Sequence, residues 1–218
     1  MKKNDNISKF LIRAQEEERR KIARELHDEI GQALTAIKIN LELLKRKIDQ
    51  NLINYIEDSI NLIDKTIEQV RNLSLNLRPS LLDDLGLISS LKWYIEREKR
   101  RNNLNIEYVF DFEQEKINKD LSINIFRIVQ EGLTNIIKHA QARNIFLEIK
   151  EEGEKILIII KDDGIGFDVE NIWEKVREGR ALGILGIKER VELFNGNMEI
   201  KSKKGEGTEI KIILSLSI

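Results

Sequence analysis

Two long apolar seams dominate the first third of the chain. Hydrophobic residues recur at steps of four and three within residues 7–48, and a second seam of the same kind covers residues 56–77. This spacing is typical of a long amphipathic helix and not of a strand. The seams consist of Ile22, Leu26, Ile30, Leu34, Ile37, Leu41, Leu44 and Ile48, and then of Ile56, Ile60, Ile63, Ile67, Val70, Leu73 and Leu77.

The polar residues Asp49, Gln50 and Asn51 separate the two seams and predict a short connection between two antiparallel helices. One hairpin cannot bury both seams, because each helix needs more than one apolar neighbour. We therefore expect two chains to pair into a four-helix bundle, which makes the protein a homodimer.

The only proline, Pro79, marks a change of pattern along the chain. Proline disfavours helix at the residue before it, so this stretch is interpreted as a hinge or linker. We predict a helical hairpin over residues 1–78, a linker over 79–84 and a second domain over 85–218.

The second domain mixes strand and helix patterns without regular alternation. It is predicted to be an α/β sandwich with a mixed sheet, one face of which is covered by helices. The apolar run at 155–161 is the expected central strand. Helices are predicted at 85–101, 123–140 and 187–194, and strands at 105–112, 144–150, 155–161, 198–202 and 208–216.

Composition excludes several classes of function. The 37 basic and 38 acidic residues give a net charge of −1, so there is no electrostatic case for nucleic-acid binding. The chain has no cysteine, which excludes disulfides and thiolate metal sites and fits a reducing compartment. We see no run of about 18 apolar residues and no signal-peptide pattern, so we expect a cytoplasmic chain without a membrane segment.

The helix predicted at 123–140 carries Glu131, Asn135 and Lys138 in a narrow arc, at i, i+4 and i+7. A carboxylate, an amide oxygen and an ammonium in line suit the binding of a hard cation and phosphate. The alternative is a solvated helix face with a favourable charge pair.

Three glycine-containing segments follow that helix. Asp162 comes directly after the apolar strand and is followed by Gly164 and Gly166. Its carboxylate can accept a hydrogen bond from a base amine, and the glycines let a ring approach the backbone. Gly183 and Gly186 open a predicted helix, a place where N–H groups can face phosphate. The alternatives are a plain turn, an ordinary helix start and, for the segment that ends at Gly207 and Thr208, a hairpin turn.

The chain has only two histidines, His27 and His139. His27 adjoins Asp28 and lies close to Gln32. In an α-helix, Asp28 and Gln32 share one face, and His27 lies about 100° around the helix from Asp28. A neutral imidazole is an adequate nucleophile near neutral pH and needs a phosphoryl donor brought in line. The alternative for His27 alone is an ordinary surface histidine.

The order and spacing of these segments resemble the ATPase fold shared by histidine kinases, gyrase, Hsp90 and MutL. The resemblance implies that Asn135 holds Mg²⁺, that Asp162 binds the adenine amine, and that residues 164–186 form a lid over the phosphates of ATP. By the same resemblance, Glu131 is placed with Asn135 at the metal and among the catalytic residues. The further nucleotide-binding residues are Lys138, His139, Gly164, Gly166, Gly183, Gly186, Gly207 and Thr208.

Motifs in the first half of the chain, taken with those in the second, indicate one subfamily of these proteins. The strings ERRKIARELHDEIGQALTAI, LRPSLLDDLGL, NIIKHA and GIKERVELFNG resemble the NarL-family sensor histidine kinases. This implies that His27 is the phospho-acceptor, that Asp28 assists phosphoryl transfer, and that Gln32 positions water to hydrolyse a partner's phospho-aspartate. The implied partner is a response regulator with a receiver domain and a helix-turn-helix DNA-binding domain.

Two positions depart from the family pattern. Ala181 replaces the usual first glycine of the second glycine segment, and Asp163 stands where many related kinases carry Asn. Two rival functions follow from other classes. One is a dimeric module that acts as a regulator phosphatase or by sequestration, and the other is a serine/threonine kinase of the anti-sigma type, against which the long hairpin argues.

Overall fold

The computed structural model describes residues 2–46, 50–77, 80–178 and 182–216. The chain forms two compact units, Met1–Asp83 and Asp84–Ile218. None of the described helices is both long enough and apolar enough to cross a membrane.

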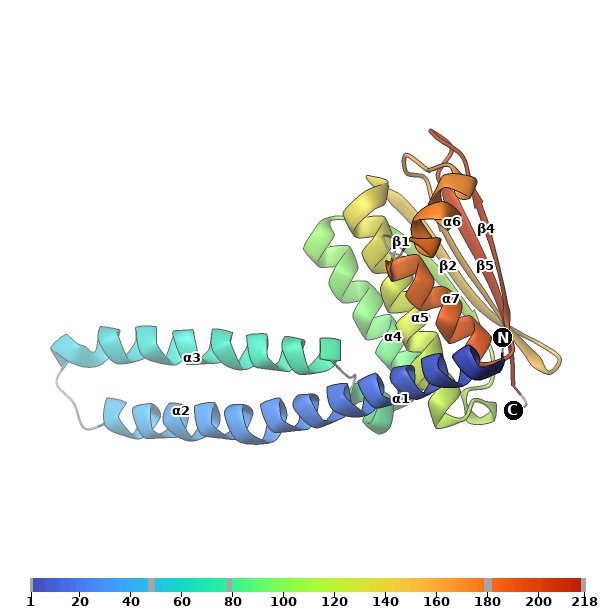
Figure 1. Cartoon of the computed structure of the whole chain (residues 1–218). Coiled ribbons are helices and arrows are strands. Elements are labelled where there is room, and N and C mark those ends of the chain that lie inside the picture. The colour runs from blue at the N-terminus through green and yellow to red at the C-terminus, as the bar shows by residue number, and fades with distance from the viewer. Residues whose placement is uncertain (1, 47–49, 78–79, 179–181, 217–218) are drawn as a thin grey trace. The chain divides into compact units, whose positions relative to one another are not determined.

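The first unit is the predicted helical hairpin. Its first arm consists of α1 (Lys2–Glu25), a π-helical turn η1 (Leu26–Gly31) and α2 (Gln32–Lys45), and its second arm is α3 (Gln50–Leu77). The helices α2 and α3 lie side by side (Figure 1).

Two ion pairs hold the two arms of the hairpin in register. The ammonium of Lys38 lies 2.7 Å from the carboxylate of Asp64, and that of Lys45 lies 2.7 Å from Glu57. The pairs are seven residues apart on each helix, which is the antiparallel register that the seams require.

The hairpin buries only one side of each seam. Ile56 and Ile60 of α3 are buried, whereas no described residue of α2 is buried. The exposed large side chains of this unit include Ile30, Ile37, Ile39, Leu43, Leu44, Leu52, Tyr55, Leu62 and Leu73. The unit therefore carries a wide apolar surface that its own helices leave uncovered.

The second unit begins within α4 (Ser80–Asn102), which is interrupted at Gly86. Gly86 has φ +78° and ψ −179°, a conformation essentially restricted to glycine. The side-chain carbonyl of Gln114 accepts a hydrogen bond of 2.9 Å from the N–H of Ile88, so it caps the helical segment after the break. The predicted helix at 85–101 is present, and helix begins at Ser80, within the predicted linker. Pro79 lies outside the described residues.

The rest of the unit is a mixed five-stranded sheet with helices on one face (Figure 1). The strands are β1 (Asn105–Asp111), β2 (Asn144–Glu152), β3 (Lys155–Asp162), β4 (Asn197–Ser202) and β5 (Thr208–Ser215), in the order β1-β2-β3-β5-β4. β1 and β2 run parallel, and the other pairs are antiparallel. The helical elements are α4, η2 (Gln114–Lys116), α5 (Lys119–Asn135), a π-helical turn η3 (Ile136–Ala140), α6 (Val169–Arg177) and α7 (Leu182–Leu193).

Burial alternates along the strands, as expected for a sheet with one covered face. The helix-facing positions of β3 include Ile156, Ile158 and Ile160, which are at most 1% exposed. Gly132 of α5 lies over Ile160, where a Cβ atom would come within 2.5 Å of the Ile160 side chain. A glycine at this point therefore lets α5 pack closely on the central strand.

The structure has more helix in the C-terminal half than the sequence predicted. The glycine-rich segment 164–186, interpreted as a lid, contains the helix α6, whose first turn is capped by Asp168. The helix expected at 187–194 begins earlier, at Leu182, so Gly183 and Gly186 are helical and do not precede the helix. Glycine is a weak helix breaker of about 1 kcal/mol, and tertiary packing of α7 overrides it here.

Candidate functional site

The residues around His27 lie in the π-helical turn η1, which contains His27 and Asp28 and ends immediately before Gln32. The segment was expected to be regular α-helix, and the structure instead has a π-helical turn, which bonds residue i to residue i+5. Asp28 and Gln32 are exposed, and the side chain of His27 lies outside what the structure describes. A π-helical turn in a long helix is a frequent mark of a functional segment.

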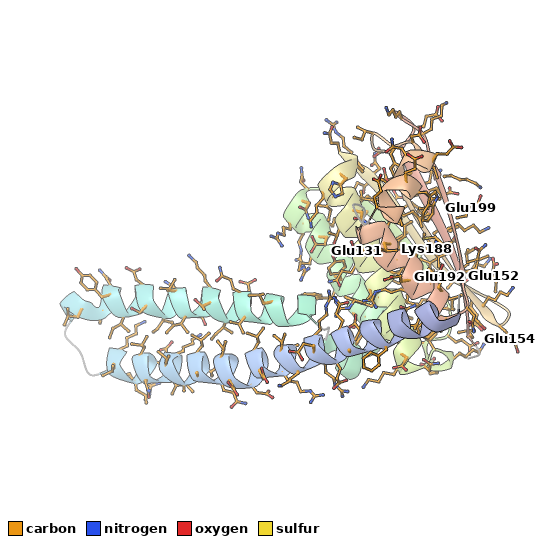
Figure 2. All side chains as sticks on the ribbon, viewed as in Figure 1. Glu131, Glu152, Glu154, Lys188, Glu192 and Glu199 are labelled. Carbon is orange, nitrogen blue, oxygen red and sulfur yellow. The ribbon has the colours of Figure 1, made fainter. Side chains whose placement is uncertain are left out.

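In the second unit, Glu131 and Asn135 lie on α5 beneath the first turn of α7. Both side chains are half-buried. A Cβ atom built on Gly183 would lie 2.5 Å from the Glu131 Oε1 atom and 2.7 Å from the Asn135 Oδ1 atom. Figure 2 shows Glu131 on α5, and Lys188 and Glu192 on α7, which packs against α5. The structure therefore brings Glu131, Asn135 and Gly183 together.

Lys138 and His139 are placed differently from the expected arc. The α-helix ends at Asn135, and both residues belong to the π-helical turn η3. Glu131 and Asn135 therefore keep their i, i+4 relation within α5, whereas Lys138 lies beyond the end of that α-helix. The side chains of Lys138 and His139 are exposed and follow the end of α5.

Asp162 is the last residue of β3 and is 5% exposed. Its Oδ1 atom accepts a hydrogen bond of 2.8 Å from the N–H of Gly164. Burial raises the pKa of this carboxyl above its usual value, and the neighbouring Asp163 charge adds to the rise. A buried carboxylate with raised pKa at a strand end is typical of a binding or catalytic position.

The backbone packs tightly around Asp162. A Cβ atom on Gly164 would lie 2.2 Å from the carbonyl oxygen of Ala140, and one on Gly207 would lie 2.1 Å from the carbonyl oxygen of Asp162. Gly166 and Gly207 also have positive φ angles, +57° and +78°, which favour glycine. These three predicted glycines therefore hold two loops close to the carboxylate.

Gly186 is the exception among the predicted glycines. It lies in α7, and a Cβ atom there would meet nothing within 4 Å. No contact of Gly186 in the described residues points to a phosphate.

These groups fit a bound adenine nucleotide. The Asn135 Nδ2 atom is buried and has no hydrogen-bond partner within the described part of the chain. A buried donor without a partner costs free energy, so a ligand acceptor at this position would be favourable. The Asp162 carboxylate adds a buried acceptor that suits the amine of a base.

Comparisons with known proteins agree with this geometry. The family described as "Histidine kinase" matches residues 18–82, and the family described as "Histidine kinase-, DNA gyrase B-, and HSP90-like ATPase" matches residues 120–218. The signal transduction histidine-protein kinase/phosphatase DegS of Brevibacillus brevis is 36% identical over 212 residues, which is 95% of this chain and 53% of DegS. The chain belongs to the histidine kinases.

Solved histidine kinases share the fold. The histidine kinase domain of the blue-light activated histidine kinase of Erythrobacter litoralis matches with a TM-score of 0.56 and 18% identity, over 85% of this chain and 95% of the domain. A longer structure of the same kinase matches with a TM-score of 0.53 over 88% of this chain and 60% of that one. The predicted membership in the NarL-type sensor histidine kinases, an N-terminal helical domain followed by an ATPase domain, is confirmed. The chain spans about half the length of the curated relative.

Two residues of this histidine kinase site escaped the sequence predictions. Ser202 bonds to both loops that flank Asp162. Asn144 bonds through its side chain to Asp163, whose carboxylate also accepts bonds of 2.8 and 2.9 Å from the N–H groups of Arg143 and Asn144. These bonds hold the pKa of Asp163 below its usual value. No motif marks either residue, and only the strand register brings them to the site.

Asp163 departs from the family pattern, and its contacts show what it does here. Its carboxylate ties the start of β2 to the end of β3. The other departure, Ala181, lies outside the described residues.

Proposed function

We propose that this protein is the catalytic core of a two-component sensor histidine kinase that phosphorylates His27 from ATP and passes the phosphoryl group to a response-regulator aspartate. The observation that carries the proposal is the site around Asp162. It combines a buried carboxylate, tightly packed glycine loops and the Asn135 amide without a partner, in a chain that also carries the histidine segment. The kinase and phosphatase activities named for DegS support it.

In the proposed site, Asp162 accepts a hydrogen bond from the adenine amine, and Gly164 and Gly166 let the base approach the backbone. Glu131 and Asn135 supply oxygen ligands for Mg²⁺, which neutralises phosphate charge when it is bound. The described residues contain no group of three or more acidic, histidine or cysteine side chains suited to a metal, so Glu131 and Asn135 would be the ligands that the protein itself supplies. Gly183, Gly207, Thr208, Lys138 and His139 complete the proposed nucleotide site, and Gly186 remains part of it by resemblance alone.

The proposed transfer forms a bond between the His27 imidazole nitrogen and the γ-phosphorus while the bond from that phosphorus to the ADP oxygen breaks. Asp28 orients the imidazole and takes its proton. In a second step the phosphoryl group moves to the aspartate of a receiver domain. In the proposed phosphatase activity, Gln32 positions a water molecule that hydrolyses this phospho-aspartate. The exposure of Asp28 and Gln32 suits contact with a visiting receiver domain.

The proposed assembly is a homodimer in which the hairpins of two chains form a four-helix bundle. Its support is the apolar surface that the hairpin leaves exposed, such as Ile37 and Leu44. We propose domain ranges of 1–78, 79–84 and 85–218, a cytoplasmic location, and a receiver-domain partner that carries a helix-turn-helix domain. Direct binding of nucleic acid by this chain is not expected, since its net charge is −1.

The test is incubation of the purified protein with γ-labelled ATP and Mg²⁺, beside His27→Gln. The proposal expects label that is lost in acid, survives base and is absent from the variant. Absence of label from a folded protein that still binds ATP would overturn the kinase proposal. It would favour a regulator phosphatase or sequestering module that uses Asp28 and Gln32.

A further inference from the structure

Three polar residues form one row across the sheet at the nucleotide site. In the strand register, Ser202 of β4 lies opposite Thr208 of β5, and Thr208 lies opposite Asp162 of β3. Side chains of directly opposed residues point to the same face of a sheet. Asp162 and Thr208 are buried, 5% and 9% exposed, on the helix-covered face.

The Ser202 hydroxyl has three hydrogen-bond neighbours. Its oxygen lies 2.9 Å from the backbone nitrogen of Phe167, 3.0 Å from the carbonyl oxygen of Gly207 and 3.0 Å from the hydroxyl oxygen of Thr208. These contacts join the loop after β3 to the turn before β5, the two loops that flank Asp162.

The directions of these bonds follow from counting donors. A serine hydroxyl has one hydrogen and two lone pairs. The carbonyl of Gly207 can only accept, so it takes the serine hydrogen, and the N–H of Phe167 can only donate, so it uses one lone pair. The remaining lone pair of Ser202 faces Thr208, and therefore Thr208 must be the donor in that contact.

This count fixes what Thr208 can offer to a ligand. Its only hydroxyl hydrogen is committed to Ser202, so toward the nucleotide its oxygen can only accept. Asp162, as a carboxylate in the same row, also only accepts. Two acceptors side by side favour the 6-amino group of adenine and disfavour the 6-carbonyl group of guanine or hypoxanthine, which is itself an acceptor.

We propose that Ser202 is a specificity-determining residue that selects 6-aminopurine nucleotides by holding the Thr208 hydroxyl as an acceptor. This inference rests on the proposed function, since it takes Asp162 and Thr208 to bind the base. Ser202 itself does not touch the nucleotide and acts as a positioning residue through Thr208. Its loss frees the Thr208 hydroxyl to rotate and donate, which removes the penalty against a 6-carbonyl group.

The experiment compares ADP with inosine diphosphate, because the two ligands differ at the 6 position of the base. Calorimetry measures both dissociation constants for the full chain and for Ser202→Ala, Ser202→Thr and Ser59→Ala. Ser202→Thr keeps a hydroxyl at the site. Ser59→Ala removes a hydroxyl that bonds to a backbone carbonyl in the helical hairpin and serves as the control. Thermal midpoints report whether each variant is folded.

We expect the preference for ADP over inosine diphosphate to fall about threefold to tenfold in Ser202→Ala, the equivalent of one hydrogen bond. The preference should be retained in Ser202→Thr and in Ser59→Ala. An unchanged ratio of the two dissociation constants in a folded Ser202→Ala protein would overturn the inference. If both constants rose by the same factor, Ser202 would only hold the two loops together. If the unmodified chain binds no ADP, the proposed function itself fails, and the inference fails with it.

Discussion

The two units of this histidine kinase treat large hydrophobic side chains in opposite ways. In the hairpin, Ile37 and Leu44 remain 49% and 52% exposed, although they belong to the seam that defines the helix. In the ATPase unit, Leu91 and Ile95 of the helix α4 are fully buried. One unit completes its core from its own chain, and the other leaves a surface that a second chain can complete.

The polar groups differ in the same sense. Asp28 and Gln32 of the hairpin are exposed, whereas Asp162 of the ATPase unit is buried and hydrogen-bonded to the loop that follows it. A buried, bonded carboxylate is held ready for a small ligand, and exposed groups are accessible to another protein domain. The comparison supports the proposal that one unit binds the nucleotide and the other contacts protein partners.

The largest expected effect comes from placing a charge on the uncovered face of the hairpin. In Ile37→Lys, each chain of the proposed dimer would bury an unpaired ammonium, which is strongly unfavourable. We expect the dimer dissociation constant, measured by sedimentation, to rise about a hundredfold or more, where each tenfold is 1.4 kcal/mol.

The matched control is Thr35→Lys, at an exposed polar position on the opposite side of the same helix. It should leave the dimer intact, and both variants should bind ATP as the unmodified chain does. An unchanged dimer dissociation constant in Ile37→Lys would contradict the proposal that a second chain covers this face of the hairpin.

The next prediction concerns the core of the ATPase unit. Leu91→Ala removes a side chain that is fully buried, and the cavity should lower the free energy of unfolding by about 2–5 kcal/mol. Urea denaturation measures the loss. Leu85→Ala, at a position that is 56% exposed, should change stability far less. Equal losses at the two positions would show that α4 does not pack as described.

The smallest effect concerns the hydrogen bonds that Asp163 accepts from Arg143 and Asn144, here called the Asp163 clamp, and it depends on pH. The hydrogen bonds from Asn144 and Arg143 hold the pKa of Asp163 below its ordinary value of 3.8, so its contribution to stability is present above that value. Asp163→Ala should therefore lose on the order of 1 kcal/mol at neutral pH. The difference from the unmodified chain should shrink as the pH falls through the lowered pKa. A difference that grows in acid would contradict the clamp.

The sequence predicted the elements whose periodicity is strong. The hairpin, the five strands and α5 all lie where their apolar patterns place them, because burial on one side of a helix or sheet imposes that pattern. The amino-acid composition did not predict α6 or the first turn of α7. Glycines and charges there suggest a loop, but the structure has helix. The π-helical turns were also beyond prediction, since a wider turn leaves no periodic signature in five or six residues.

The site was predictable where a residue carries the chemistry itself and not where it positions another residue. Asp162 and the glycines stand out as a motif, and the structure brings them together. Ser202 and Asn144 reach the site only through the pairing of β4 with β5 and of β2 with β3. Register of this kind depends on the whole sheet, so a single sequence does not reveal it.

The most direct test of the division between the units is calorimetric titration of Mg·ATP into His27→Gln and into Asp162→Ala. If the ATPase unit alone holds the nucleotide, His27→Gln binds with the affinity of the unmodified chain, and Asp162→Ala loses binding. Loss of binding in His27→Gln, or undiminished binding in Asp162→Ala, would contradict that division.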